Sequence, residues 1–492
     1  MGQLVPTYWT EVLPGDSFRI RQENLIRFAP LIAPVMHDVK VKTYWFYVPW
    51  RLVYPNWENF ISPDNADERN IVWPHAQFTN AAFDVNSLAN YMDLPMASSI
   101  TRQLSVLPFA AYFKIYDEWF RNAQIQETDQ FVEVVDGLQT SYNGKATAPP
   151  LNSNYELDYF TSALPYAQKG DVITIPLLQT NQDPVVGLSG NYSQWLQRSA
   201  ATGAIYGQTG SIDAQGSGIV QGGGPQAIML DPVDTLGLLN FQTNAASITD
   251  LRNAYQLQSF QERDARGGTR YIEMIKNHWG VTSSDARLNR PEVIGMFSNY
   301  IAFSAVEQTS QTDAAGTAQG NLAGHGIGIN GAGDMDIFCE EHGMIISMTT
   351  VKPGTSYSQG IHRKWERKTR LDYPWPSFQT IGEQEIRMSE INYDAADPDA
   401  PFGYVPRYSE VKFQNDTISG EFRTSLSQYH LSRIFDLALN PPVLNGTFLE
   451  VKAADSDRIF AVEGLWTHHL WCHFYHSVKV KRSLSYYGNP MM

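Results

Sequence analysis

The feature that most constrains the fold is the alternation of apolar and charged residues in VMHDVKVKTYWFYVP (35–49). In an extended chain, one face of this segment would carry Val39, Val41, Thr43, Trp45 and Tyr47, with the intervening lysines on the other face. A period of two is typical of a β-strand that covers a core with one face. DSFRIRQENLIRF (16–28) alternates in part and predicts a second strand. Further strands are predicted in the runs 338–351, 405–413 and 457–482.

A few segments have the spacing of helices. LPFAAYFKIYDEWFRNA (107–123) repeats its aromatic residues at the intervals of one buried helical face, formed by Phe109, Tyr112, Phe113, Tyr116 and Phe120. A second helix is predicted over 247–266, with a buried face made by Ile248, Leu251, Ala254 and Tyr255. A possible third helix covers 427–438.

The order of these elements limits the fold class. Strands near both ends of the chain, with partly helical stretches between them, do not fit an alternating βαβ fold. They favour a mainly β fold, either an antiparallel sandwich or a jelly roll with long connections. Two prolines in residues 1–15 predict an extended N-terminal arm. The stretches 181–227 and 309–335 have a turn-rich composition and little periodicity, and they predict long surface insertions.

Composition narrows the range of functions. The chain has 492 residues and a formal charge of −15. So acidic a chain is not expected to bind nucleic acid over its whole surface, because phosphate binding requires a local basic patch. Its two cysteines, Cys339 and Cys472, make no disulfide framework. No secretory signal is expected at the N-terminus, and no uncharged apolar run reaches about 18 residues, so membrane insertion is not expected.

Two motifs could carry chemistry but fit structural positions better. THHLWCHFYH (467–476) offers zinc-type ligands, but a strand points neighbouring side chains to opposite faces. The pair left on one face, His469 and His473, would lie about 13 Å apart. GIGING (326–331) matches G-x-G-x-x-G without the strand and helix that a nucleotide site needs, so a loop is expected. No metal ligand, cofactor or catalytic residue is predicted, and the chain is not expected to be an enzyme.

Two runs interleave positive charge with aromatic residues, IHRKWERKTR (361–370) and VKVKRSLSYYGNP (478–490). This pattern suits single-stranded nucleic acid, because cations follow the phosphate backbone and aromatic rings stack on bases. A solvated face or an intersubunit contact is the alternative. The candidate DNA-contact residues are Arg363, Lys364, Trp365, Arg367, Lys368, Arg370, Lys479, Lys481 and Arg482.

Charge is also concentrated in ERDARGGTRY (262–271), at the end of the second predicted helix. Gly267 can take the left-handed conformation that ends a helix. The arginines there have planar donor forks that suit carboxylates or carbonyls, either in the same chain or in a neighbouring subunit. An anion or DNA contact is a third possibility. The candidate residues of this subunit-interface or structural network are Glu262, Arg263, Asp264, Arg266 and Arg270.

Several stretches, in the order expected along the chain, together resemble the major capsid protein of microviruses. These are small tailless phages with circular single-stranded DNA, and the gokushovirus-like branch is the most similar. The resemblance covers most of the chain and is weakest over 181–245 and 296–335. It is carried by EVLPGDSFRI (11–20), YWFYVPWRLVYPNWENF (44–60), LPFAAYFKIYDEWFRN (107–122), LQSFQERDARGGTRYIEMIKNHWGV (257–281) and FGYVPRYSEVKF (402–413).

The resemblance implies a fold, an assembly and a set of partners. The fold is an eight-stranded antiparallel viral jelly roll with long, partly helical insertions, forming a single domain over 1–492. The assembly is a T=1 icosahedral capsid of sixty copies, built through pentamer intermediates. The implied partners are the single-stranded DNA genome, an internal scaffolding protein, a DNA pilot protein, a small basic DNA-binding protein and a host surface receptor. The protein would lie in the virion and assemble in the host bacterial cytoplasm.

The resemblance also implies a role for the 181–245 region. In gokushovirus-like members, a variable insertion at this position forms protrusions at the threefold axes. The candidate host-attachment residues in this region are Tyr192, Trp195 and Tyr206. The alternative to a capsid is an aromatic-rich β-sandwich that binds or hydrolyses glycans, and such a protein would run as a small oligomer on gel filtration.

Overall fold

The structure is a computed structural model. The chain divides into two compact units, residues 1–170 with 260–492 and residues 171–259. The residues that the structure describes are 1–62, 71–79, 83–96, 101–127, 130–170, 173, 248–309, 320–437, 441–462, 468–484 and four short strands between 197 and 221.

One four-stranded antiparallel sheet contains the strand with the clearest alternation in the sequence. Its order is β1 (Val5–Val12), β13 (Gly343–Pro353), β3 (Val39–Pro49) and β10 (Glu292–Tyr300). Every residue of β13 is buried, so this sheet is covered on both faces. The predicted extended arm thus contains an edge strand, β1, which pairs with β13.

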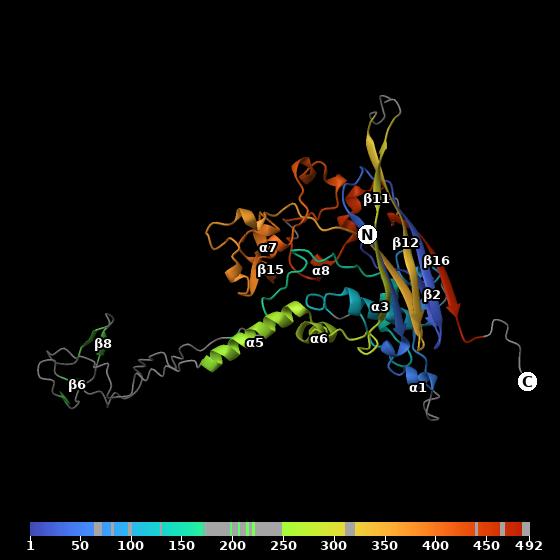
Figure 1. Ribbon diagram of the computed structural model, residues 1–492, viewed down its shortest axis with the longest axis horizontal. Coiled ribbons are helices and arrows are strands. Elements are labelled where there is room, and N and C mark those ends of the chain that lie inside the picture. Colours follow the sequence, from blue (N-terminus) through green and yellow to red (C-terminus); the bar gives the residue numbers. More distant parts are fainter. Residues whose placement is uncertain are drawn as a thin grey trace, which may run out of the picture. The chain divides into compact units, whose positions relative to one another are not determined.

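The other four-stranded sheet is also antiparallel. Its order is β11 (Ala302–Glu307), β12 (Leu322–Phe338), β2 (Ser17–Phe28) and β16 (Leu470–Lys481), and the last three lie side by side in Figure 1. Burial alternates along β2, with even-numbered residues buried and most odd-numbered ones exposed. This sheet therefore has one covered face and one face open to solvent.

The covered faces of the two sheets pack against each other. One cluster joins Phe18 and Ile20 of β2 to Trp45 and Ile345 of the other sheet. The Trp45 indole N–H donates to the buried Gln22 carbonyl across the sandwich at 2.9 Å. A second cluster continues the core with side chains of β2, β3 and β13. The described part of the chain is thus mainly β and antiparallel, as the alternation predicts.

The outer face of the first sheet is covered by helical segments. The helix α3 (Leu107–Ile115) continues into a π-helical turn (Tyr116–Phe120), and the predicted aromatic stripe lies in this region. Four of the five rings of the stripe are buried, three of them in an apolar cluster that α3 forms with the first sheet. The fifth ring, Phe120, packs against this cluster beside Phe46. The helix over 107–123 is therefore predicted correctly in its position and its buried face.

The later part of the first unit is built from short elements around a third apolar cluster. Here β14 and β15 pair antiparallel, and loops that contain short 3-10 helices surround them. Further elements of this unit are α1 (Trp57–Ile61), β4 (His75–Thr79), α2 (Leu88–Tyr91), β5 (Thr101–Ser105), α4 (Ser141–Thr147), α6 (Tyr271–Trp279), β14 (Glu383–Arg387), β15 (Pro401–Pro406), α7 (Ser409–Lys412) and α8 (Gly446–Leu449).

The second unit contains two short antiparallel strand pairs and the first part of a long helix. The strands are β6 (Gln197–Arg198), β7 (Ile205–Tyr206), β8 (Asp213–Gln215) and β9 (Ile219–Gln221), and the helix is α5 (Ile248–Gly267). Most of the predicted insertion 181–245 lies outside the described residues.

Some predicted elements are wrong. GIGING was expected to be a loop but is part of the strand β12, because its glycines let the backbone pack closely against Phe28 and Phe303. The helix over 427–438 is reduced to one 3-10 turn, Ser427–Tyr429, and 405–413 is mostly a turn and the helix α7. Along α5, the predicted core residues Leu251 and Tyr255 are exposed.

Candidate nucleic-acid interface and assembly elements

The open face of the β11-β12-β2-β16 sheet gathers basic and aromatic side chains. Register places Lys479 of β16 opposite Arg19 of β2, and Trp471 opposite Arg27. All four of these side chains are exposed. The outward side chains of the two strands that carry charge or rings are Arg19, Arg21, Glu23, Arg27, Trp471, His473, Tyr475, Lys479 and Lys481. Cations beside exposed rings are the elements that bind a single strand.

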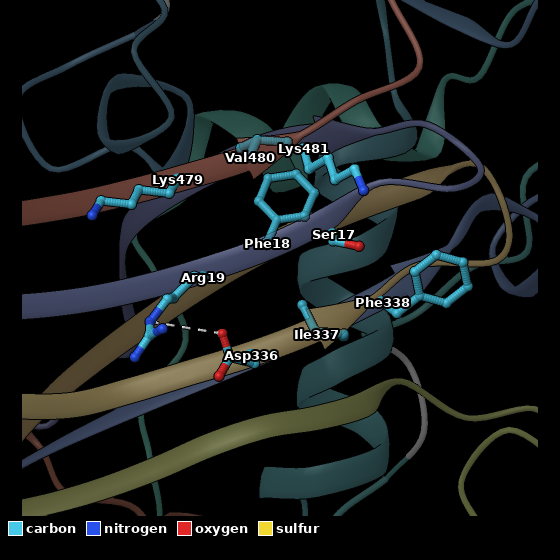
Figure 2. A pocket seen from close by; sticks show the side chains of 9 residues that line it. All are labelled: Ser17, Phe18, Arg19, Asp336, Ile337, Phe338, Lys479, Val480 and Lys481. Carbon is cyan, nitrogen blue, oxygen red and sulfur yellow. Dashed lines mark ion pairs between the residues drawn. The ribbon is translucent and has the colours of Figure 1, made fainter.

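At one end of this face lies a shallow depression of about 470 Å³ (Figure 2). Figure 2 shows Lys479 and Lys481 projecting from β16 and Arg19 from the neighbouring strand β2. One carboxylate lines the depression, that of Asp336, which lies 3.9 Å from the Arg19 Nε. Three basic groups stand here beside two carboxylates, Asp336 and the neighbouring Asp334, which leaves this end of the sheet locally positive on an acidic protein.

Arg19 is held in place by its neighbours on β12. Its guanidinium donates to Asp334 at 2.8 Å, and this hydrogen bond together with the two nearby carboxylates raises the Arg19 pKa. Both partners are well exposed, so the pair adds little to stability. Its effect is to orient the guanidinium along the sheet surface.

The third predicted contact at this end, Arg482, has another role. Its guanidinium binds the buried Asp16 carboxylate beyond the end of β16, with hydrogen bonds of 2.7 to 3.0 Å. Lys479 and Lys481 are exposed and point away from the core, whereas Arg482 ties the strand to the turn between β1 and β2.

The run 361–370 lies elsewhere, in the loops around β14 and β15. Arg363 donates to the Glu385 carbonyl at 2.6 Å and to the buried Glu390 carboxylate at 3.3 Å. Arg367 pairs with the buried Glu410 at 3.4 Å. The predicted contact residues of this run that are exposed are Lys364, Trp365, Lys368 and Arg370. The structure therefore does not gather the nine predicted DNA-contact residues on one surface.

The charged cluster 262–270 contacts other segments of the first unit of the same chain. Arg266 donates to the Glu383 carboxylate at 2.7 Å. Arg270 donates to the Arg121 carbonyl at 2.8 Å. The carboxylate of Asp264 lies 3.4 Å from Lys169 and 3.8 Å from His278. These contacts fix the α5–α6 turn against β14 and the region after α3.

The two glycines of this cluster are required for different structural reasons. Gly268, not Gly267, has the left-handed conformation, with φ of +96°. Gly267 is the last residue of α5 and faces Asn277 of α6, where a Cβ would lie only 2.6 Å from the Asn277 Cβ. Arg263 and Asn277 also exchange hydrogen bonds between side chain and backbone carbonyl. The close approach of α5 and α6 therefore explains why residue 267 is a glycine.

The remaining predictions concern the candidate host-attachment residues and the histidine-rich run 467–476. Tyr192 and Trp195 lie outside the described residues, and so does the side chain of Tyr206, which ends β7. The run 467–476 falls mainly on β16, where His476 packs between Tyr8 and Trp45 and His473 is exposed. Among the described residues, no group of three His, Cys, Asp or Glu could hold a metal ion.

In the portions of the chain covered by the structure, no helix combines the length and the apolar character needed to cross a bilayer.

The arginines of β2 are missed by the sequence reading. SFRIRQENLIRF places Arg19, Arg21 and Arg27 at odd positions, opposite to the buried even ones, so the alternation was the available signal. Their relation to Lys479 depends on the pairing of β2 with β16, which lies more than 400 residues away in the chain.

An antiparallel β-sandwich with an open sheet face of cations and aromatic rings is compatible with a structural protein that contacts nucleic acid. Comparison with known proteins agrees: the family model described as capsid protein (F protein) matches residues 1–492. The chain is 33% identical to capsid protein VP1 of Bdellovibrio phage phiMH2K, covering 91% of this chain and 84% of that relative. It is 30% identical to VP1 of Chlamydia phage 1, covering 100% and 93% of the two chains.

A third relative is VP1 of Spiroplasma virus 4, with 30% identity over 94% of this chain and 87% of that protein. The chain therefore belongs to the microvirus capsid-protein family, and it is a structural subunit of a virion.

Proposed function

We propose that sixty copies of this chain form a T=1 icosahedral shell around a circular single-stranded DNA genome. The observation that carries the proposal is the family match over all 492 residues. Two antiparallel four-stranded sheets that share one core support an eight-stranded viral jelly roll as its framework. The segments between the strands, including α3 and α5, are then its partly helical insertions.

The open face of β2 and β16 is the proposed contact for the genome. Lys479, Lys481 and Arg19 supply cations for phosphates, and Trp471 and Tyr475 supply exposed rings for bases. For the exposed residues of 361–370, a DNA contact and a contact with a neighbouring subunit are the two alternatives. A chain of net charge −15 cannot neutralise most of the genome's phosphates, so other cations must do so. This favours a small basic DNA-binding protein as a partner.

The remaining partners rest on the sequence resemblance. Assembly proceeds in the host bacterial cytoplasm through pentamers and uses an internal scaffolding protein, and a DNA pilot protein joins the virion. The 181–245 region forms the threefold protrusion and meets the host surface receptor, with Tyr192, Trp195 and Tyr206 as candidate contacts.

The test is expression of the full chain together with the neighbouring phage genes. Negative-stain electron microscopy is expected to show uniform icosahedral particles, and nuclease treatment is expected to leave single-stranded DNA protected inside them. Small soluble oligomers alone, with every partner present, would contradict the proposal.

A further inference from the structure

Residues 364–375 form an exposed surface rich in rings and positive charge. We name Lys364, Trp365, Lys368, Arg370, Tyr373 and Trp375 the basic aromatic surface. The side chain of Trp365 is 73% exposed, and those of Tyr373 and Trp375 are about half exposed. Tryptophan, tyrosine and arginine are the residues that most often carry the binding energy of a protein interface, and lysine adds positive charge that can select an acidic partner.

Internal contacts hold this surface in one conformation. The Trp375 indole N–H donates to the Arg370 carbonyl at 2.8 Å. The backbone N–H groups of Lys368 and Thr369 both donate to the Asp372 carboxylate, at 2.9 and 2.6 Å. Because the segment is already ordered, docking onto it would cost little conformational entropy.

A second surface of the same unit has the opposite charge. We name Glu58, Ile61, Val72, Glu133, Val135 and Leu138 the acidic apolar surface, and all six are exposed or half-buried at its edge. Its three segments, 53–62, 71–79 and 130–140, contain three carboxylates and no lysine or arginine.

The three segments of the acidic apolar surface are joined by backbone hydrogen bonds. Val134 N–H donates to the Val53 carbonyl at 3.0 Å, and Gly137 N–H donates to the Val72 carbonyl at 2.9 Å. Asn56 also donates to both oxygens of Asp136, at 3.0 and 3.1 Å. The three segments therefore lie side by side, and they expose both apolar and acidic side chains.

We propose that the basic aromatic surface of one copy docks onto the acidic apolar surface of a neighbouring copy in the shell. The two surfaces are complementary, because they carry opposite charge and both expose apolar side chains. The run 361–372 has five basic and two acidic side chains, a local positive excess on a chain of net charge −15. Two different surfaces of identical copies make a heterologous contact, which generates a ring when its rotation closes. The inference rests on shell formation under the proposed function and adds the contact that would build it.

The test uses the full chain in the same co-expression system, with particle yield measured on sucrose gradients and by electron microscopy. The pair Lys368→Glu with Arg370→Glu is expected to lower particle yield at least tenfold, and so is Glu58→Lys with Glu133→Lys. Combining all four changes is expected to restore at least a third of the wild-type yield, because the charges again match. The control pair, Lys276→Glu with Arg287→Glu, changes exposed cations outside both surfaces and is expected to leave the yield unchanged.

A further variant separates this contact from DNA binding. Val135→Ser changes no charge and lies on the acidic apolar surface, so it is expected to lower particle yield while the soluble subunit keeps its thermal midpoint. Normal yield from either charge-reversed pair would overturn the docking. Normal yield with low DNA content from Lys368→Glu with Arg370→Glu would also assign the basic aromatic surface to the genome. Absence of particles from the wild type would instead reject shell formation itself.

Discussion

The Arg482 guanidinium binds both carboxylate oxygens of Asp16, a residue with no exposed surface. Burial by itself would raise the Asp16 pKa, but the hydrogen bonds from Arg482 and from the Leu13 N–H outweigh it and lower the pKa. The pair joins the chain after β16 to the turn between β1 and β2. Arg482 is thus part of the framework beneath the proposed DNA face.

Replacing Arg482 is expected to destabilise the fold. Arg482→Met leaves the buried Asp16 carboxylate without its charged partner, at an expected cost of about 3 kcal/mol. The control is Arg21→Met, whose partner Glu23 is half exposed, and it is expected to cost less than about 0.5 kcal/mol. Urea denaturation of the purified subunit measures both changes, and equal midpoints would contradict the role of the pair.

Glu156 is expected to make stability depend on acid pH. Burial alone would raise its pKa, but hydrogen bonds from Lys40 and Lys42 lower it from 4.5 to about 2. A carboxyl group with a lowered pKa stabilises the fold above its ordinary pKa and loses that contribution as the pH falls toward its folded value.

The variant that removes this dependence is Glu156→Gln. At neutral pH it is expected to be about 1 kcal/mol less stable than the wild type, since the group is partly screened by solvent. The difference is expected to shrink between about pH 4.5 and about pH 2. Thermal midpoints across that range measure it, and a difference that stays constant with pH would rule out Glu156 as the titrating group.

A methyl group at Gly267 is expected to separate α5 from α6. Gly267→Ala would place its Cβ against the Asn277 side chain, at an expected cost of about 2 kcal/mol. Gly144→Ala is the matched control, because Gly144 lies in the helix α4 with open space around it and should become slightly more stable. Hydrogen exchange of the α6 amides would locate the effect, and unchanged protection would disprove the close-contact explanation.

Charge reversal is expected to destabilise the fold much more at Arg363 than at its neighbour Lys364. Arg363→Glu puts a second carboxylate beside the buried Glu390 and is expected to cost about 3 kcal/mol or more. Lys364→Glu changes an exposed side chain and is expected to cost less than about 0.5 kcal/mol. Thermal denaturation of the two variants makes the comparison, and similar midpoints would refute the structural role of Arg363.

Reversing the charge of the open sheet face is expected to reduce packaged DNA. Lys479→Glu with Lys481→Glu removes two phosphate partners without disturbing a buried pair, so particles should form but carry less DNA. The ratio of absorbance at 260 to 280 nm of purified particles measures this, with Lys276→Glu plus Arg287→Glu as the charge-matched control. Equal ratios would remove this face from the genome contact.

The sequence predicts elements well where one local pattern determines them. The alternation in β3 predicts the strand correctly, although its sheet is covered on both faces, and the aromatic stripe of α3 lies on the predicted buried face. GIGING was mistaken for a loop because glycine is weak in isolated strands, whereas β12 gains its stability from pairing with β2 and β11. Leu251 was predicted to be buried because it suits a helix face, but an amphipathic pattern does not say whether the same chain covers that face.

The candidate sites were harder to predict because their partners come from distant segments. Lys479 and Lys481 are visible as a basic run, but Arg19 joins them only through the pairing of β2 with β16. Likewise, the sequence gives no sign that Arg367 has a partner, whereas in the structure it pairs with Glu410. Charge in a sequence thus indicates a possible contact, and the fold decides which charges already have partners.

The pairing of the outermost strands also bears on how the chain is made. Val12 pairs with Gly343 in one sheet, and Ser17 pairs with Lys481 in the other, so the second sheet joins residues made early to residues made very late. A ribosome must therefore release nearly the whole chain before the second sheet can be completed, and such distant contacts form slowly. Chains that stop before β16 keep the pairing of β2 with β12 but leave the other edge of β2 without a partner. Complete synthesis is thereby a condition for a subunit that is fit to enter a shell.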